Sequence, residues 1–319
     1  MASSMKWSVP ETIDIAKHKS QQEFVVISWN VLHMIHEINY VYDSSPVINR
    51  YSINNDFSNE KIRLNDITKT LSELLIKHST MECFICLQEV PGDLLPMLHE
   101  MFDSHANSIL ACKPVMHIQT YSRKPRIRVR QGSSVYNDSN ESLVTIHYNP
   151  KIISIEKALG LEHEKKSVLY NDQVLWTPCP TDAGKGALTV TTISGLSVVN
   201  AHVPYNNQAA SLLLRNILWP ENNNPFVFVG DINRGSKAFM NIVTKITVRK
   251  PSSNLLFPIT THKPTRVGLS PNGTLYKVWI DHYLVSASLK HLAISPAMVY
   301  DDIGDISDHY PILLQFKNT

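Results

Sequence analysis

Residues 226–233 read F-V-F-V-G-D-I-N. The first four side chains are apolar, and Gly230, Asp231 and Asn233 follow directly. A continuous apolar run of this length, ended by a turn-forming residue, predicts a short strand that is buried on both faces. The end of that strand therefore carries a carboxylate and a carboxamide two residues apart, on a support that a buried strand would hold rigid.

Other segments of the chain end in the same way, with acidic, amide or imidazole side chains after an apolar run. These endings are Trp29-Asn30, Gln88-Glu89, Asn200-Ala201-His202, Asp281-His282 and Asp308-His309. A single polar residue after a strand is usually a turn former. As a set the endings need another explanation, because turns favour Gly, Asn and Asp and do not select His or Glu.

Metal binding would explain why several acidic side chains gather. Carboxylates that are brought together repel one another and raise each other's pKa, unless a divalent cation neutralises them. The expected ligands are Asn, Glu and Asp oxygens without cysteine, and such hard donors favour Mg²⁺ or Mn²⁺ over zinc. Magnesium with few protein ligands keeps positions for water and phosphate oxygens, which indicates phosphoryl chemistry.

The order of apolar patterns predicts an α/β protein. Short runs rich in Val, Ile, Phe and Thr predict strands at 24–29, 83–87, 143–148, 188–193, 197–200, 226–229, 278–285 and 312–316. Between them, apolar residues at helical spacing predict helices at 60–78, with Ile62 on the buried stripe, and at 207–218. Residues 102–142 and 156–183 show no clear period, so we expect them to be irregular surface insertions.

Composition limits the class of protein. The chain has 319 residues, 43% of them hydrophobic, and a formal charge of +2, so any phosphate-binding charge must be local. No Gly/Ser linker divides it, and we expect an N-terminal extension at 1–22 and one domain at 23–319. Four cysteines do not form a disulfide scaffold, and we find neither a signal peptide core nor an apolar run of roughly 20 residues. These features predict an intracellular protein of the cytoplasm or nucleus with no membrane span.

The motifs W-N, Q-E, H-x-P, G-D-x-N, D-H and S-D-H-x-P occur in this order between residues 24 and 316. Each is common alone, but the ordered set resembles the endonuclease/exonuclease/phosphatase superfamily, also called DNase I-like. The resemblance covers nearly the whole chain. It implies a four-layered α/β/β/α sandwich, in which two mixed sheets pack face to face, helices lie outside, and the active site lies at one end of the strands.

The resemblance also implies a metal site and a water-activating carboxylate. Glu89 is similar to the main metal-binding carboxylate of the family, with Asn30 beside it and Asp308 on the far side. Asp231 resembles the residue that orients and deprotonates the attacking water. Asn233 would hold that water or a phosphate oxygen. The implied cofactor is Mg²⁺, with Mn²⁺ as a possible substitute.

Two histidines complete the implied site. His309 is similar to the family histidine that hydrogen-bonds the scissile phosphate, and Asp281 would fix its tautomer through the other ring nitrogen. His202 stands where many members place a histidine that contacts phosphate. The resemblance thus implies a metal-dependent phosphoric ester hydrolase in which an activated water attacks phosphorus in line.

The subclass stays open at this point. Exonuclease III-type abasic endonucleases usually carry a lysine shortly after the glutamate and a tyrosine in place of His202, and this chain has neither. Q-E-V and the histidine are more similar to 5′-tyrosyl-DNA phosphodiesterases, deadenylase-type nucleases and sphingomyelinases, and G-D-I-N-R is similar to inositol polyphosphate 5-phosphatases. We expect a phosphodiesterase for nucleic acid or a nucleic-acid adduct, without an obligate protein partner. The alternatives are an inositol-phosphate phosphatase or sphingomyelinase-like enzyme, and an inactive binding module.

Two further features could bind substrate. Residues 123–130 read R-K-P-R-I-R-V-R, and strand alternation would place Arg126, Arg128 and Arg130 on one face, where they could follow a phosphate backbone. The alternative is an edge strand that charge protects from pairing. Lys185, between two glycines, lacks the rest of a P-loop but is a candidate phosphate contact.

Overall fold

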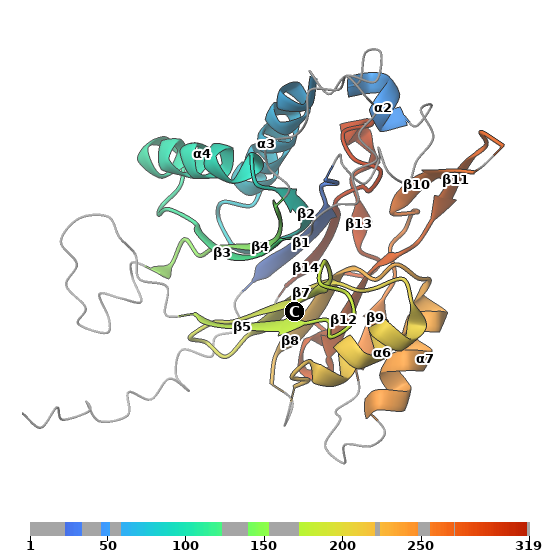
Figure 1. The fold of residues 1–319 in the computed structure, drawn as a ribbon. Helices are drawn as coiled ribbons and strands as arrows, with labels where there is room; N and C mark the ends of the chain where they lie inside the picture. Colours follow the sequence, from blue (N-terminus) through green and yellow to red (C-terminus); the bar gives the residue numbers. More distant parts are fainter. Residues whose placement is uncertain are drawn as a thin grey trace, which may run out of the picture.

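The computed structural model of this chain describes residues 23–33, 46–51, 59–122, 140–152, 172–220, 224–247, 256–270 and 272–317. Within them, two six-stranded sheets lie face to face, and a two-stranded hairpin stands apart from both. Helices α3 and α4 lie over the outer face of the first sheet, and α6 and α7 lie over that of the second (Figure 1). The segments at 1–22 and 123–139, which include Arg126, Arg128 and Arg130, are outside the described residues.

The first sheet has the strand order β13-β14-β1-β2-β4-β3. Strand β1 runs parallel to β2 and antiparallel to β14, so the sheet is mixed. The strands span β1 Phe24–Asn30, β2 Glu82–Pro91, β3 Val115–Ser122, β4 Asn140–Tyr148, β13 Met298–Val299 and β14 Ile312–Phe316.

The second sheet has the order β5-β6-β7-β8-β12-β9 and is also mixed, because β7 and β8 are parallel while the other neighbours are antiparallel. Its strands span β5 Gln173–Pro178, β6 Gly186–Thr191, β7 Ser197–His202, β8 Phe226–Asp231, β9 Leu256–Ile259 and β12 Asp281–Ser286. The separate hairpin pairs β10 Arg266–Leu269 with β11 Leu275–Val278.

Alternation along the strands builds the layers. In β1, Val25 and Ile27 pack toward the helices of the first sheet, while Phe24 and Val26 pack into the core between the sheets. In β8, Val227 and Val229 face that central core and Phe228 faces α6 and α7. A strand between two apolar layers needs apolar residues at every position, which explains its unbroken apolar runs. The predicted four-layered α/β/β/α fold is confirmed.

The helices bury one face each against these sheets. They span α2 Pro46–Tyr51, α3 Glu60–Lys77, α4 Leu94–Ser108, α6 Asn207–Asn216, α7 Ser236–Thr247 and α8 Ala287–Lys290, with a 3₁₀ turn η3 at Asp301–Ile303. On α3 the buried stripe includes Leu64 and Ile67, whereas Ile62 is 53% exposed. The prediction that Ile62 is buried was therefore wrong. Among the described residues, no helix combines the length and apolar composition needed to cross a lipid bilayer.

Two predicted irregular regions contain regular structure. Residues 102–142 include the end of α4, all of β3 and the start of β4, and residues 156–183 include β5. Strands β3 and β5 are sheet edges with polar or exposed faces, so their apolar signal is weak. The strand predicted at 278–285 is divided between β11 and β12, with Trp279 and Ile280 between them.

Candidate active site

One end of the two sheets gathers most of the polar strand endings. In the parallel pairs β1–β2 and β7–β8, the carboxyl ends lie side by side, which places Asn30 next to Gln88 and His202 next to Asp231. Strand β12 is antiparallel to β8, so its first residue, Asp281, pairs with Asp231. Residues far apart in the sequence therefore meet because of strand direction alone.

Gly230 allows the carboxyl end of β8 to lie close to β7. Its φ is 146°, and a side chain built there would overlap the carbonyl oxygen of Ala201 on β7. Only glycine fits this close approach without displacing backbone. The next residue is Asp231, so the glycine sets the position of that carboxylate.

Replacing Gly230 with Ala should lower the free energy of unfolding by about 3 kcal/mol or more, because two strands must separate. Gly195 provides the matched control: its φ is 84°, and a Cβ added there would meet nothing within 4 Å. Gly195→Ala should cost about 1 kcal/mol, from backbone strain alone. Urea unfolding of both variants measures the difference, and equal losses would contradict the close-approach explanation.

Asp231 lies at the centre of the cluster and is 2% exposed. Its Oδ1 accepts a hydrogen bond from the backbone N–H of Asn233 at 2.8 Å, and its Oδ2 accepts one from Asn30 Nδ2 at 3.1 Å. The Nε2 atoms of His202 and His309 lie 3.3 and 3.8 Å from Oδ2. Burial by itself raises the pKa of Asp231, but the charges of His309 and His202 hold it well below its usual range.

Glu89 approaches the same point from the first sheet. Its φ of 54° coincides with a register shift between Leu87 and Val90, which interrupts the pairing of β2 with β4. Such a bulge redirects a side chain at the end of a strand. Glu89 Oε1 lies 3.4 Å from His202 Nε2, so His202 stands between the two carboxylates of Glu89 and Asp231.

Lys185 also reaches this group of side chains. It precedes β6, its Nζ contacts the imidazole of His202, and it lies 3.8 Å from Glu89 Oε1. An ammonium group next to a carboxylate and a histidine is well placed to meet an anionic ligand. The candidate phosphate contact predicted from the sequence is thus beside the acidic cluster.

His309 and Asp281 form a buried dyad. His309 Nδ1 lies 2.9 Å from Asp281 Oδ2, and both residues are almost fully buried. Burial lowers the pKa of His309, but Asp281, Asp308 and Asp231 together raise it to about 9. These three carboxylates therefore favour the protonated ring, whose Nε2 lies 3.8 Å from Asp231 Oδ2.

Asp308 has one oxygen in a hydrogen bond and one that lies 3.9 Å from His309 Nε2. Its Oδ2 accepts a hydrogen bond from Arg266 Nε at 2.7 Å. Its Oδ1 is buried and has no hydrogen-bond partner within the part of the chain that the structure describes. A buried carboxylate oxygen normally has a partner, so this atom is suited to a cation or a bound water.

The residues of the cluster fit a hard divalent cation. Ligand atoms of Glu89, His202 and Asp231 lie within 4.8 Å of one another, and a second group joins Asp231, Asp281 and His309. Carboxylate oxygens dominate the set, as Mg²⁺ and Mn²⁺ prefer. Asn30 has different partners: its Oδ1 accepts from the N–H of Leu32 and its Nδ2 donates to Asp231. Direct metal ligation by Asn30 stays a prediction.

Buried arginines hold the loops around the site. Arg63, which is 0% exposed, donates to the carbonyl oxygens of Val31 and Leu32 after β1 and of Ile306 before Asp308. Arg234 donates to the carbonyl oxygens of Ile232 and Pro204, which joins the loops after β8 and β7. Backbone that is fixed in this way keeps the acidic side chains in place.

The structure brings together nearly all the residues predicted for the site. These are Asn30, Glu89, Lys185, His202, Asp231, Asn233, Asp281, Asp308 and His309. Sequence reasoning missed Arg266, because it begins a short hairpin strand 42 residues before its partner Asp308 and matches no strand-end pattern.

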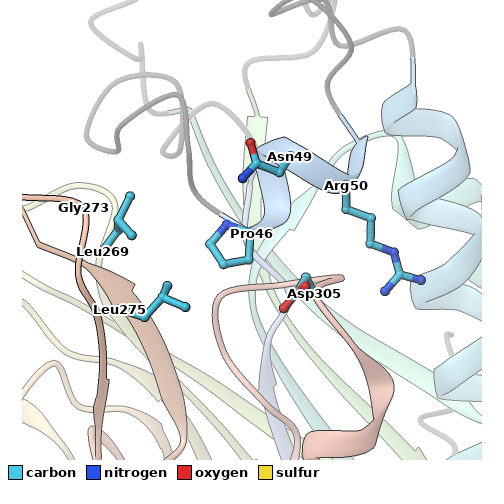
Figure 2. Close-up of a pocket in the computed structure, with 7 residues that line it drawn as sticks. All are labelled: Pro46, Asn49, Arg50, Leu269, Gly273, Leu275 and Asp305. Carbon is cyan, nitrogen blue, oxygen red and sulfur yellow. The ribbon is translucent and has the colours of Figure 1, made fainter.

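A separate hollow of about 560 Å³ lies between α2, the β10–β11 hairpin and the loop after η3 (Figure 2). Its lining includes Pro46, Arg50, Leu275 and Asp305, and none of the candidate catalytic side chains. Strand β10 links the two regions, since Arg266 at its start pairs with Asp308 while Leu269 at its end lines the hollow.

No protein-family model matches this sequence, and no curated protein matches it. Among solved structures, an endonuclease/exonuclease/phosphatase family protein from Leptotrichia buccalis C-1013-b has a TM-score of 0.52 at 13% identity, over 92% of this chain and 100% of that one. Mannosyl-6-phosphatase Bt3783 of Bacteroides thetaiotaomicron VPI-5482 has a TM-score of 0.49 at 13% identity, over 92% of this chain and 100% of that one. A humanized D. rerio TDP2 has a TM-score of 0.48 at 14% identity, over 93% of this chain and 99% of that one.

The similarity to the Leptotrichia protein extends along nearly the whole of both chains. Because the sequence identity is only 13%, this similarity establishes the fold alone. Two mixed sheets face to face, with helices outside, agree with it. The resemblance inferred from the ordered motifs is confirmed at the level of fold. This chain has the fold of the endonuclease/exonuclease/phosphatase superfamily, the DNase I-like fold.

Proposed function

We propose that this protein is a divalent metal-dependent phosphoesterase that hydrolyses phosphodiester bonds in nucleic acid or in a nucleic-acid adduct. The observation that supports this most is the meeting of Glu89, His202 and Asp231 with the Asp281–His309 dyad in one buried cluster. Such a group of acids and histidines suits phosphoryl transfer, in which catalysis is mainly positioning and electrostatic stabilisation.

Glu89 and Asp308 would hold the cation, together with Asn30 either directly or through water. A bound Mg²⁺ or Mn²⁺ would supply charge neutralisation at the phosphate oxygens. The buried Oδ1 of Asp308 supports its part in this set. The short bond between Arg266 and Asp308 Oδ2 would leave Oδ1 in a fixed direction.

Asp231 would act as the base. An aspartate is ionised at neutral pH, so its carboxylate would orient the attacking water and accept a proton from it as the water oxygen bonds to phosphorus. The bond from phosphorus to the leaving oxygen breaks on the opposite side. Asn233, whose backbone N–H and side-chain amide both donate to Asp231, would hold the carboxylate and the water in line.

His309 would stabilise the charge that develops on phosphate. With Nδ1 donating to Asp281, Nε2–H of the protonated ring would donate to a phosphate oxygen or to the departing oxygen. Lys185 would supply further positive charge next to the imidazole of His202, which lies 3.3 Å from Asp231 Oδ2. The three groups surround the place where a phosphate would meet Asp231.

Metal removal provides the first test. Dialysis against EDTA should abolish phosphodiester hydrolysis, and added Mg²⁺ or Mn²⁺ should restore it, because neighbouring carboxylates and phosphate repel without a cation. The measurement is the initial rate on a panel of single-stranded DNA and RNA, abasic duplex, 5′-tyrosyl DNA, poly(A), inositol phosphates and sphingomyelin. Activity that survives EDTA would contradict the proposal.

The panel also separates the substrate classes. Cleavage of the polynucleotides or of tyrosyl DNA supports the nucleic-acid assignment. Turnover confined to inositol phosphates or sphingomyelin would replace it with a head-group phosphatase or phosphodiesterase. Absence of turnover on every substrate, with the fold intact, would favour a binding module that has lost catalysis.

Salt dependence tests the proposed role of the basic segment. If Arg126, Arg128 and Arg130 contact backbone phosphates, they contribute to the salt dependence of nucleic-acid binding. Replacing all three with Gln should reduce the slope of the logarithm of the association constant against the logarithm of salt concentration by roughly 2 to 3. The matched control replaces Lys61, Lys69 and Arg215, which are exposed on the outer helices α3 and α6, with Gln. An unchanged slope in the arginine variant would remove these residues from the substrate site.

The proposal includes a location and a domain. We place the protein in the cytoplasm or nucleus, since the chain has only four cysteines and all of them are buried. We also propose one catalytic domain at 23–319 after an extension at 1–22, because both sheets contribute side chains to the same site.

A further inference from the structure

A second group of titratable side chains lies at the opposite end of the sheets. His117 is on β3, His147 is near the end of β4, Glu82 begins β2, and Asp172 directly precedes β5. Because β2 starts at Glu82 and carries Glu89 toward its other end, this group is separated from the candidate active site by the length of the strand.

Both histidines of this group contact the same oxygen atom of Asp172. Asp172 Oδ2 lies 2.9 Å from His117 Nε2 and 2.7 Å from His147 Nδ1. The other ring nitrogen of His147, Nε2, lies 2.8 Å from Glu82 Oε1. The side chains of His147, Asp172 and Glu82 are at most 4% exposed, so the contacts are buried.

We propose that His117 Nε2, His147 Nδ1 and the Asp172 carboxylate form a zinc site, distinct from the site of phosphoester hydrolysis. Two imidazole nitrogens and one carboxylate are typical zinc ligands, and their ligand atoms lie within 4.8 Å of one another. Ligands of a tetrahedral zinc ion about 2.0 Å away are separated by roughly 3.3 Å, so the group must open by only about half an ångström.

Glu82 provides independent support for the assignment. A histidine that binds metal through one ring nitrogen usually donates its other N–H to a carboxylate, which fixes the tautomer and the direction of the ring. His147 has this arrangement, with Nδ1 directed at the group and Nε2 directed at a buried Glu82. A histidine on a polar surface would not need a buried carboxylate behind it.

Charge balance among the four side chains also favours a divalent cation. Asp172 and Glu82 are two carboxylates in a nearly dry environment, and a divalent cation would neutralise both charges. With two neutral histidines and one Zn²⁺, the four side chains and the ion sum to zero. Neutral imidazole is also the form that binds metal.

The proposed site lies between the two sheets. His117 and His147 belong to the first sheet, whereas Asp172 leads into β5, the edge strand of the second. One ion would therefore join the edges of the two sheets. His117 is 12% exposed at its side chain, which gives the ion a route from solvent and leaves a fourth position for water.

The test uses the full-length protein with Glu89→Gln, which weakens cation binding at the active site. Zn²⁺ alone is titrated into this protein at neutral pH by calorimetry, and X-ray absorption at the zinc edge reports the ligands. We expect about one tightly held Zn²⁺ per chain, with nitrogen and oxygen ligands at about 2.0 Å. The melting temperature should rise by roughly 5 °C at a hundredfold excess of zinc over Kd.

The matched pair of variants is His117→Gln and His99→Gln in the same background. His99 is an exposed histidine of α4, so its loss should leave zinc binding unchanged. His117→Gln should remove the tight site and the rise in melting temperature. If that variant fails to fold, Asp172→Asn in the same background provides the second variant and should also remove the tight site.

Three results would overturn the proposal: no tight zinc binding to the parent protein, binding that persists in His117→Gln, or a zinc ion coordinated by other ligands. In those cases the group is a hydrogen-bonded bridge in which a protonated His147 joins Asp172 and Glu82. Failure here leaves the proposed phosphoesterase function untouched, since the two sites share no residue.

Discussion

Asp231→Asn should lower kcat by about 10²- to 10⁴-fold and leave the fold intact. The substitution retains the size of the side chain and its contact with the N–H of Asn233, but removes the base and one negative charge from the cluster. The loss should appear in kcat rather than in KM, because proton transfer from water occurs only in the transition state. Steady-state kinetics measures the change in kcat and KM, and circular dichroism checks that the fold is intact.

Asp302→Asn is the matched control, because Asp302 is an exposed residue of η3. It should retain full activity. A near-normal kcat for Asp231→Asn would show that another group activates the water, and the role of Asp231 would then be structural.

His309→Ala should reduce turnover by about 10²- to 10³-fold, since it removes a charged donor to the phosphate. The variant should also lose about 3 to 5 kcal/mol of folding free energy, because Asp281 then remains buried without its cation. Both residues are almost fully buried, at 3% and 2% exposure, so water does not easily replace the ring. Kinetics at a temperature below the melting point of the variant, combined with urea unfolding, separates the two effects.

A double-mutant cycle with Asp281→Ala checks the explanation of the stability loss. If an uncompensated carboxylate causes it, removing Asp281 as well should restore part of the folding free energy, while kcat stays low. Strictly additive losses of stability would contradict the ion-pair account. A stable His309→Ala with normal turnover would remove His309 from the site.

Much of the fold follows from the apolar patterns of the strands. Residues 226–229 and 24–29 are buried on both faces, so their runs are continuous and easily recognised. Strands β3 and β5 were not predicted, because an edge strand is half exposed and carries polar residues such as His117 and Gln119. The four-layer packing came from the resemblance, since local periodicity does not specify which faces meet.

The candidate site residues give a clearer signal in the sequence than the edges of the sheets do. Glu89, His202 and Asp231 stand at the ends of buried strands, where chemistry and position both appear in the sequence. Arg266 and the distal group around Asp172 gave no such signal, because their partners come from short or irregular segments distant in the chain. Long-range side-chain pairing depends on topology, which the sequence pattern does not contain.

The central claim is that Glu89 and Asp308, which lie far apart in the sequence, share one cation beside Asp231 of the second sheet. Its most direct test is the anomalous difference map of a crystal soaked in Mn²⁺. The proposal predicts a peak about 2.0 to 2.3 Å from the Glu89 carboxylate, with Asp308 bound to the same ion directly or through water, and with Asp231 facing it. A peak elsewhere, or a Glu89 and Asp308 too distant to share one hydrated ion, would contradict it.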